Sequence, residues 1–352
     1  MTLIGGELIA GERAAKRDAE TRYQVTDLGS LPWVADDVLA RLNDSGEISF
    51  WRATPNGTIH AFAFNAGVPR DLGTLQGDAS SVSRSINALG QIVGWSVSGK
   101  NLVDSLAVTH SFLYNGGRMI DLGTLGGRDS QAMAINDAGQ VVGVSTLADK
   151  EKHAFLYDKG KLTDLGTLAG GSYSTASAIS RSGVIAGTAE TATHFVHAVL
   201  WTGNTLVDLG TLPSGKRSRA LDLNDKGAVI GFSETADEEV HGFLYRDGRM
   251  QDLGSLGKDP IRPNAINERG QIVGVSGVTK YVRHAFIWEN GKIEDLNRLI
   301  PANPPWRLQE AQDINSEGQI LCLGTRSGAS ADRRLLLLNQ QSTREADGQR
   351  DR

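Results

Sequence analysis

One motif recurs along almost the whole chain and constrains its fold more than any other feature. At residues 153–157 it reads His-Ala-Phe-Leu-Tyr, followed by a glycine turn at Gly160 and by Asp164-Leu165-Gly166. Each copy places its histidine 11 residues before its aspartate. The histidines are His60, His110, His153, His197, His241 and His284, and the aspartates are Asp71, Asp121, Asp164, Asp208, Asp252 and Asp295. Such recurrence indicates a repeat protein, in which each copy is one structural unit.

Each repeat holds four short runs of apolar or β-branched residues, separated by turns with Gly and Asn. Such runs predict a four-stranded antiparallel meander. Counted from Asp27, the aspartates are spaced by 44, 50, 43, 44, 44 and 43 residues, which is the period of a propeller blade. Glycine makes up 42 of the 352 residues, as expected for a chain with many tight turns.

The number of repeats predicts how the ring closes. Seven positions end the first strand of a repeat: Asn43, Asn87, Asn136, Ser180, Asn224, Asn267 and Asn315. The seventh repeat stops after its third run at Leu338, and Tyr23–Leu31 supplies the missing fourth strand. We therefore predict an all-β, seven-bladed β-propeller over residues 22–339, because closure by an N-terminal strand removes exposed sheet edges. In the last blade Arg333 is predicted in the histidine position, with Asp27 as its partner.

The segments outside the repeats carry weaker signals. Residues 1–21 are predicted as an extension that is helical or disordered, and residues 340–352 as a disordered charged tail. Residues 1–21 lack the apolar core of a signal peptide, so a cytoplasmic location is expected.

The motifs resemble a known family. His-Ala-Phe and Asp-Leu-Gly-Thr-Leu-Gly-Gly, with Ala-Ile-Asn-x-x-Gly-Gln-Val-Val-Gly between them, are similar to the bacterial HAF-repeat family over roughly residues 23–338. The resemblance implies a repeat fold and an extracellular location, and it implies no reaction.

Composition excludes several classes of function. A net charge of −5 and a pI near 5.8 leave no electrostatic footprint for nucleic acid. Cys322 is the single cysteine, so no internal disulfide framework exists, and no apolar run approaches the length of a membrane span. Metal-ligand spacings, phosphate loops and nucleophile elbows are absent from the sequence, so we expect no metal and no cofactor. A monomer is expected.

The repeated His and Asp side chains are interpreted as framework. One active site needs one set of groups, whereas these residues recur in every blade. Across the hairpin that turns at Gly160, His153 and Asp164 fall within reach of each other, and a carboxylate satisfies the imidazole N–H. Phe155 and its equivalents are predicted to fill the space between adjacent sheets.

Function is expected where the repeats differ. The loops after the second strand and after Asp-Leu-Gly share one rim of the ring, called here the variable rim, and they vary in length and chemistry. Two of these loops carry insertions, at Ser98–Thr109 and Pro301–Arg307. Tryptophans outside the repeat pattern occur on the blades that flank them. We therefore predict a ligand site on the variable rim of blades 7, 1 and 2, formed by Trp33, Trp51, Arg52, Arg84, Trp95, Trp306 and Arg307. A loop-built core that these tryptophans cover is an equal alternative.

The mouth of the central channel is a second candidate for the ligand site. Polar residues near the starts of the innermost strands differ between blades: Arg84, Gln131, Arg219, Arg262, Asn264, Glu310 and Gln312. Such groups can orient a small ligand, or they can simply be solvated channel lining.

Two classes of function fit these features. The first is a binding scaffold that holds a small molecule or a protein partner at the variable rim. The second is a metal-free lyase, isomerase or cyclase with its pocket at the same rim or at the channel mouth, where Asp37 or Glu310 would act as base.

Overall fold

The structure is a computed structural model that describes residues 22–30, 39–65, 67–99, 107–257, 259–279, 282–301, 305–326 and 329–341. The predicted N-terminal extension, residues 1–21, lies outside the described residues. So does the predicted tail, apart from residues 340 and 341. Among the described residues, no helix is long and apolar enough to cross a membrane.

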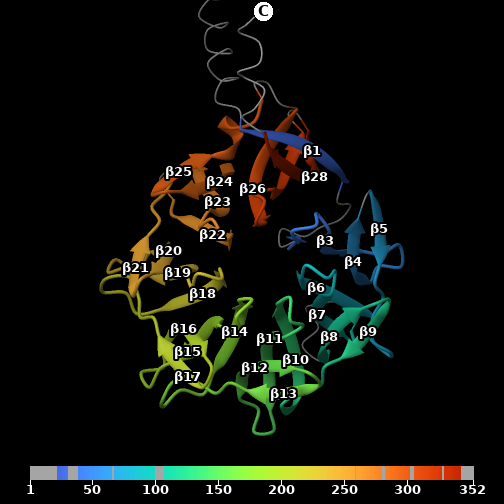
Figure 1. Ribbon diagram of the computed structural model, residues 1–352, viewed down its shortest axis with the longest axis vertical. Coiled ribbons are helices and arrows are strands. Elements are labelled where there is room, and N and C mark those ends of the chain that lie inside the picture. Colours follow the sequence, from blue (N-terminus) through green and yellow to red (C-terminus); the bar gives the residue numbers. More distant parts are fainter. Residues whose placement is uncertain are drawn as a thin grey trace, which may run out of the picture.

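Seven four-stranded antiparallel sheets surround a central axis, and they confirm the predicted seven-bladed propeller (Figure 1). Blades 1 to 4 are β2 (Arg41–Leu42), β3 (Ile48–Ala53), β4 (Ile59–Asn65) and β5 (Val68–Asp71); β6 (Ser80–Ile86), β7 (Ile92–Val97), β8 (Thr109–Asn115) and β9 (Arg118–Asp121); β10 (Gly126–Ile135), β11 (Val141–Leu147), β12 (Lys152–Asp158) and β13 (Lys161–Asp164); and β14 (Ser174–Ile179), β15 (Ile185–Glu190), β16 (Val196–Thr202) and β17 (Thr205–Asp208). Blades 5 to 7 are β18 (Ser218–Leu223), β19 (Val229–Glu234), β20 (Val240–Arg246) and β21 (Arg249–Asp252); β22 (Ile261–Ile266), β23 (Ile272–Thr279), β24 (Val282–Glu289) and β25 (Lys292–Asp295); and β26 (Trp306–Ile314), β27 (Ile320–Arg326), β28 (Ala329–Gln340) and β1 (Tyr23–Ser30). A single turn of 3-10 helix, η1 (Leu296–Arg298), follows β25.

The N-terminal strand completes the last blade, as predicted. Strand β1 pairs antiparallel with β28, and Tyr23, at its start, is only 1% exposed in the core of blades 6 and 7. The register of the ion pair corrects the prediction by one residue. Asp27 lies opposite Leu336, so Arg334, two residues before Leu336, occupies the histidine position, and Arg334 Nη1 lies 3.2 Å from Asp27 Oδ2.

The predicted framework roles of the repeated residues are confirmed in part. The equivalents of Phe155 are buried between blades. The histidine Nδ1 lies within hydrogen-bond distance of its aspartate in five blades, as in the His153–Asp164 pair at 2.9 Å. These pairs are less buried than expected, since 37% of the Asp164 side chain is exposed. The aspartate has a second role, because its Oδ1 also accepts the backbone N–H of the glycine two residues later, which fixes the interblade turn.

A β-bulge near the end of the innermost strand changes which side chains face the axis. In β6 the register shifts between Ser83 and Ser85, and equivalent shifts occur in other blades. A bulge leaves an extra residue and breaks the alternation of side chains along the strand. The strand also passes close to the neighbouring one: a Cβ on Gly143 would lie 2.0 Å from the carbonyl oxygen of Gln131. Only glycine fits there.

The turns after the first strands form a ring of hydrogen bonds, interrupted at blade 4, on the opposite face, called here the Asn rim. The Nδ2 of Asn87 donates to the backbone oxygen of Asn136 at 3.0 Å, and the same bond links each asparagine of the series to the next blade. Blade 4 differs, because it carries Ser180 in this position. The ring ties neighbouring blades together and explains why asparagine recurs there.

Candidate functional site

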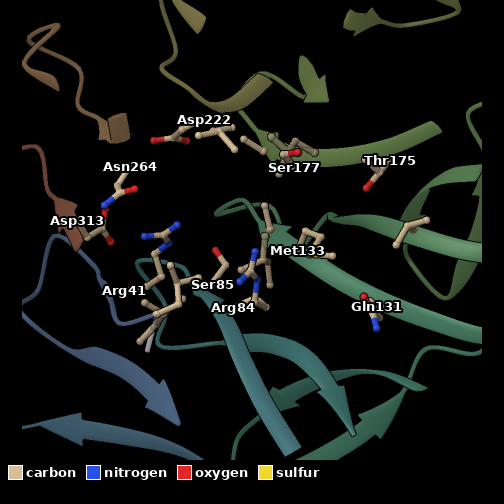
Figure 2. A pocket seen from close by; sticks show the side chains of 18 of the residues that line it. Arg41, Arg84, Ser85, Gln131, Met133, Thr175, Ser177, Asp222, Asn264 and Asp313 are labelled. Atoms are coloured by element: carbon tan, nitrogen blue, oxygen red, sulfur yellow. The ribbon is translucent and has the colours of Figure 1, made fainter. Parts of the chain in front are cut away.

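A cavity of about 600 Å³ lies on the axis and is lined by the innermost strands. Its volume falls within the range of small-molecule sites. Because of the bulges, consecutive residues such as Arg84, Ser85 and Ile86 line it together. Figure 2 shows Arg41, Ser85 and Arg84 along one wall, Asp222 across from them, and Asn264 beside Asp313.

An apolar layer forms the inner end of the cavity. Ile86, Ile135 and Ile179, each preceding the residue of the asparagine series, line this cavity and also a smaller pocket of about 190 Å³ at the Asn rim. The layer therefore lies between the two spaces. The cavity extends from it toward the variable rim, where Lys152 and Tyr173 belong to its lining.

Arg84 is the most unusual group in the cavity. Its Nε is fully buried and has no hydrogen-bond partner among the described residues. Its guanidinium carbon lies 5.6 Å from the centre of the Trp95 ring. Burial, with a smaller effect from the neighbouring Arg41, lowers the pKa of Arg84 from 12.5 to about 10. An arginine stays charged in a protein, so this direction means that its surroundings oppose the charge.

Arg41, in contrast, is held by the fold. Its Nη1 donates to the backbone oxygen of Gln312 at 2.7 Å, and its charge acts on Asp222 and Asp313. Burial raises the pKa of Asp222 to about 6 and raises that of Asp313. Asp222 accepts the backbone N–H groups of Ile266 and Leu223, both at 2.9 Å. The oxygens of Asp313 likewise accept the N–H groups of the next blade and of its own strand. Both carboxylates therefore join blades.

The charge of the cavity is opposite to that of the chain. Its lining carries four cationic side chains, Arg41, Arg84, Lys152 and Arg262, against the two carboxylates Asp222 and Asp313. The chain as a whole carries −5. A concave site that concentrates positive charge attracts anions.

The Asn rim shows a structural use for its charges. Asp137 accepts the backbone N–H of Ala88 at 2.9 Å, and Arg181 lies between Asp137 and Asp225. Glu268 accepts the N–H of Asp225 in the same way.

Among the described residues, no group of three or more His, Cys, Asp and Glu side chains could hold a metal ion.

The described residues of the site predicted on blades 7, 1 and 2 lie in different surroundings. Trp33 and Asp37 lie outside the described residues, as do residues 100–106 and 302–304 of the two insertions. Trp51 is buried in β3, and Trp95 takes the same position in β7. Arg52 stacks on Phe62 at 4.3 Å. Of the described members, only Arg84 lines the cavity.

The remaining predicted residues belong to blade 7. Trp306 lies at the start of β26, with Arg326 and Arg334 each 5.8 Å from its ring. Arg307 Nη2 lies 3.2 Å from His284 Nε2. Glu310 accepts a hydrogen bond from Asn264 at 3.1 Å. Each of these side chains has a partner within the fold.

Sequence reasoning missed Arg41, Asp222 and Asp313. All three lie two residues before the asparagine of their blade, where the other blades carry Ser or Ala: Ser85, Ala134, Ala178 and Ala265. Charged residues in a position that is otherwise small were the signal that could have identified them.

Comparison with known proteins adds the fold alone. No family model and no curated protein matches the chain, so the likeness to the HAF-repeat family stays a prediction. The β-propeller domain of the Trilobed protease from Pyrococcus furiosus is 10% identical, with a TM-score of 0.56 over 91% of this chain and 98% of that one. A puromycin-hydrolyzing peptidase of Mycobacterium tuberculosis is 13% identical, with a TM-score of 0.55. The match covers 94% of this chain and 53% of the peptidase chain. YCF48 bound to D1 peptide is 9% identical, with a TM-score of 0.50 over 92% and 96% of the two chains.

Proposed function

We propose that the protein binds a small anionic ligand in its central cavity, with Arg84 as the group that recognises the negative charge. One observation carries the proposal: Arg84 is a partly buried cation whose Nε is fully buried, and the described residues supply neither an anion for its charge nor a hydrogen bond to Nε. Buried charges in proteins are normally paired, because an unpaired one costs several kcal/mol. A ligand anion would supply the missing partner.

The surroundings of Arg84 suit such a ligand. The cavity has the volume of a small-molecule site, and Ser85, Ser177, Thr175 and Asn264 add neutral polar groups to its wall. The isoleucine layer provides an apolar inner end. A guanidinium offers a planar pair of donors that fits a carboxylate or a phosphate group.

Catalysis at this cavity has less support. The carboxyl group of Asp222 has the raised pKa expected of a general base, but burial accounts for it and both oxygens already accept backbone N–H groups. These two hydrogen bonds hold the carboxylate in place as a link between blades 5 and 6, which accounts for its position without a catalytic role. Binding without chemistry is therefore the function we propose. A partner surface on the variable rim of blades 7, 1 and 2 stays a prediction.

The proposal is tested by thermal unfolding with a panel of small anions at constant ionic strength. Carboxylates, phosphate monoesters and sulfonates would be compared with their neutral analogues, using the wild type, Arg84→Met and the control Arg118→Met. Arg118 is exposed on the outer strand β9. Ligands that bind the folded state raise the melting temperature by mass action. We expect at least one anion to stabilise the wild type and the control but not Arg84→Met. An equal response in all three proteins, or no response to any anion, would overturn the proposal.

A further inference from the structure

We infer that the ligand is a linear molecule with an anionic group at each end, one held by Arg84 deep in the cavity and the other by Lys152 at its mouth. This inference rests on the proposed function, because it takes Arg84 as the anchor for the first group. It adds a second binding position and fixes the shape of the ligand.

The first support is a groove that continues the cavity. A space of about 190 Å³ lies between blades 2 and 3, and Gln131, Val144 and Lys152 line both this groove and the central cavity. Lys152 therefore stands where the two spaces meet. Its backbone is bridged to Tyr173 of blade 4, which fixes the position of its Cα between two blades.

The second support is that most polar groups of the groove are already used by the fold, including Asp129, whose Oδ1 accepts the N–H of Thr109. Ser130 Oγ donates to the carbonyl of Gly123 and accepts the N–H of Ser111. Ser145 and Thr146 both donate to the carbonyl of Asp129. Among the described residues, Lys152 has no ion pair and the Gln131 side chain no hydrogen bond, so these two groups remain for a ligand.

The third support comes from the repeats. Lys152 is the residue before the motif histidine, a position that holds Ile59, Thr109, Lys152, Val196, Val240 and Arg283 in blades 1 to 6. Of these residues, Lys152 lines the central cavity. Arg84 is equally particular to its blade, since Met133 and Ser177 take its place in blades 3 and 4. The two cations thus depart from the repeat in neighbouring blades that border one cavity.

The strand register gives the scale of the ligand. Ser145 pairs with both Ser130 and His153, so Lys152 is level with Asp129. In β10, Met133 takes the position of Arg84, and the four steps from Met133 to Asp129 span about 13 Å along the strand at 3.3 Å per residue, while Lys152 lies two strands farther out, at about 4.8 Å per strand. Two long side chains reach into this span from its ends. The anionic groups of the ligand would then lie on the order of 6–10 Å apart, as in a straight-chain dicarboxylate of medium length.

Isothermal titration calorimetry at low salt tests this directly. The probes are the straight-chain dicarboxylates from succinate to suberate and the monocarboxylates of equal carbon number, at a pH where all are ionised. The proteins are the wild type, Lys152→Met, Arg84→Met and the control Lys161→Met. Lys161 is exposed on the outer strand of the same blade. Melting curves show that each variant is folded.

We expect the wild type and Lys161→Met to bind one dicarboxylate length at least tenfold more tightly than its monocarboxylate. Lys152→Met should bind both equally, at the wild-type monocarboxylate affinity, whereas Arg84→Met should bind neither. If dicarboxylates show no advantage, or if Lys152→Met retains it, the second position is wrong while binding at Arg84 stands. If no carboxylate binds the wild type, this inference fails, and the wider anion panel decides whether the proposed function fails with it.

Discussion

The guanidinium of Arg334 lies 3.2 Å from the carboxylate of Asp27 and so joins the last long strand of the propeller to the first. The pair occupies the place that a histidine and an aspartate hold in other blades, such as His153 and Asp164. A two-point guanidinium donor replaces the imidazole, and the partner now comes from the other end of the sequence. The ring is therefore closed by pairing between strands β1 and β28 that are far apart in the chain.

Removing the closing strand should destroy the ring. A chain that begins at residue 31 lacks β1, which exposes the edge of β28 and removes Tyr23 from the core. We expect it to unfold or to oligomerise through the free edge. Size-exclusion chromatography and thermal unfolding measure this, with a chain that begins at residue 22 as the control. A monomer that lacks β1 and melts like the control would disprove closure.

The repeated residues should affect stability in an order set by their burial. Phe155 is fully buried, so Phe155→Ala should lower the free energy of unfolding by about 3–5 kcal/mol. Asp164→Ala loses two hydrogen bonds that are partly exposed, and we expect a cost of about 1–2 kcal/mol. His153→Ala should cost about 0.5–1 kcal/mol. Urea unfolding measures all three. A loss for His153→Ala equal to that for Phe155→Ala would mean that the histidine has another role.

The hydrogen-bond ring of the Asn rim lacks its link from blade 4 to blade 5, and a single substitution should supply it. Ser180 takes the asparagine position there, and the repeat predicts the backbone oxygen of Asn224, which already accepts the N–H of Gly227, as the acceptor in the next blade. Ser180→Asn should add the missing bond and raise the free energy of unfolding by about 0.5–1.5 kcal/mol. The reverse change, Asn136→Ser, should lower it by a similar amount. Equal melting of Ser180→Asn and the wild type would show that the ring adds no stability.

Stability should fall as the pH rises from the pKa of Asp222 in the unfolded chain to its raised pKa in the folded protein. Burial raises the pKa of its carboxyl group to about 6 in the folded protein, whereas it is near 3.9 in the unfolded chain. Between these values the folded state binds more protons, so the free energy of unfolding decreases from about pH 4 to pH 6 and then levels. Asn mimics the protonated form. Asp222→Asn should therefore match the wild type near pH 4 and exceed it at pH 7.

Thermal unfolding across this pH range tests that difference, with Asp237→Asn on the surface as the control. Asp313 contributes in the same direction, because its pKa is also raised by burial. Comparing each variant with the wild type at the same pH removes the shared contribution of Asp313. An Asp222→Asn curve parallel to that of the wild type would contradict the assignment.

The repeat predicts the fold because each copy of the motif corresponds to one four-stranded blade. The period gives the blades, and the absence of a fourth run after Leu338 gives the closure. The prediction places Arg333 in the histidine position that Arg334 occupies, and this error has a physical cause. Two adjacent arginines precede four leucines, so no alternation marks the register, and a bulge between Asp27 and Gly29 shifts the partner strand.

The cavity was harder to predict because bulges break the period of two. In a regular strand Arg84 and Ser85 would point to opposite faces, yet both line the cavity. The same shift lies between Ala220 and Asp222. Sequence reasoning could place Arg84 near the channel, but it could not show that the Nε of Arg84 would be buried without a hydrogen-bond partner. That depends on distances between blades.

The most direct test of the central claim is the stability of Arg84→Met without ligand. If Arg84 is kept for a ligand, the apo protein holds a charge that its surroundings oppose, because Nε is buried without a partner and burial lowers the pKa of the guanidinium. The contact with the Trp95 ring stabilises the Arg84 guanidinium by only about 0.5–2 kcal/mol. We therefore predict that Arg84→Met melts at a higher temperature than the wild type, as functional residues often reduce stability. A lower melting temperature would show that Arg84 belongs to the framework, and the proposed binding function would lose its basis.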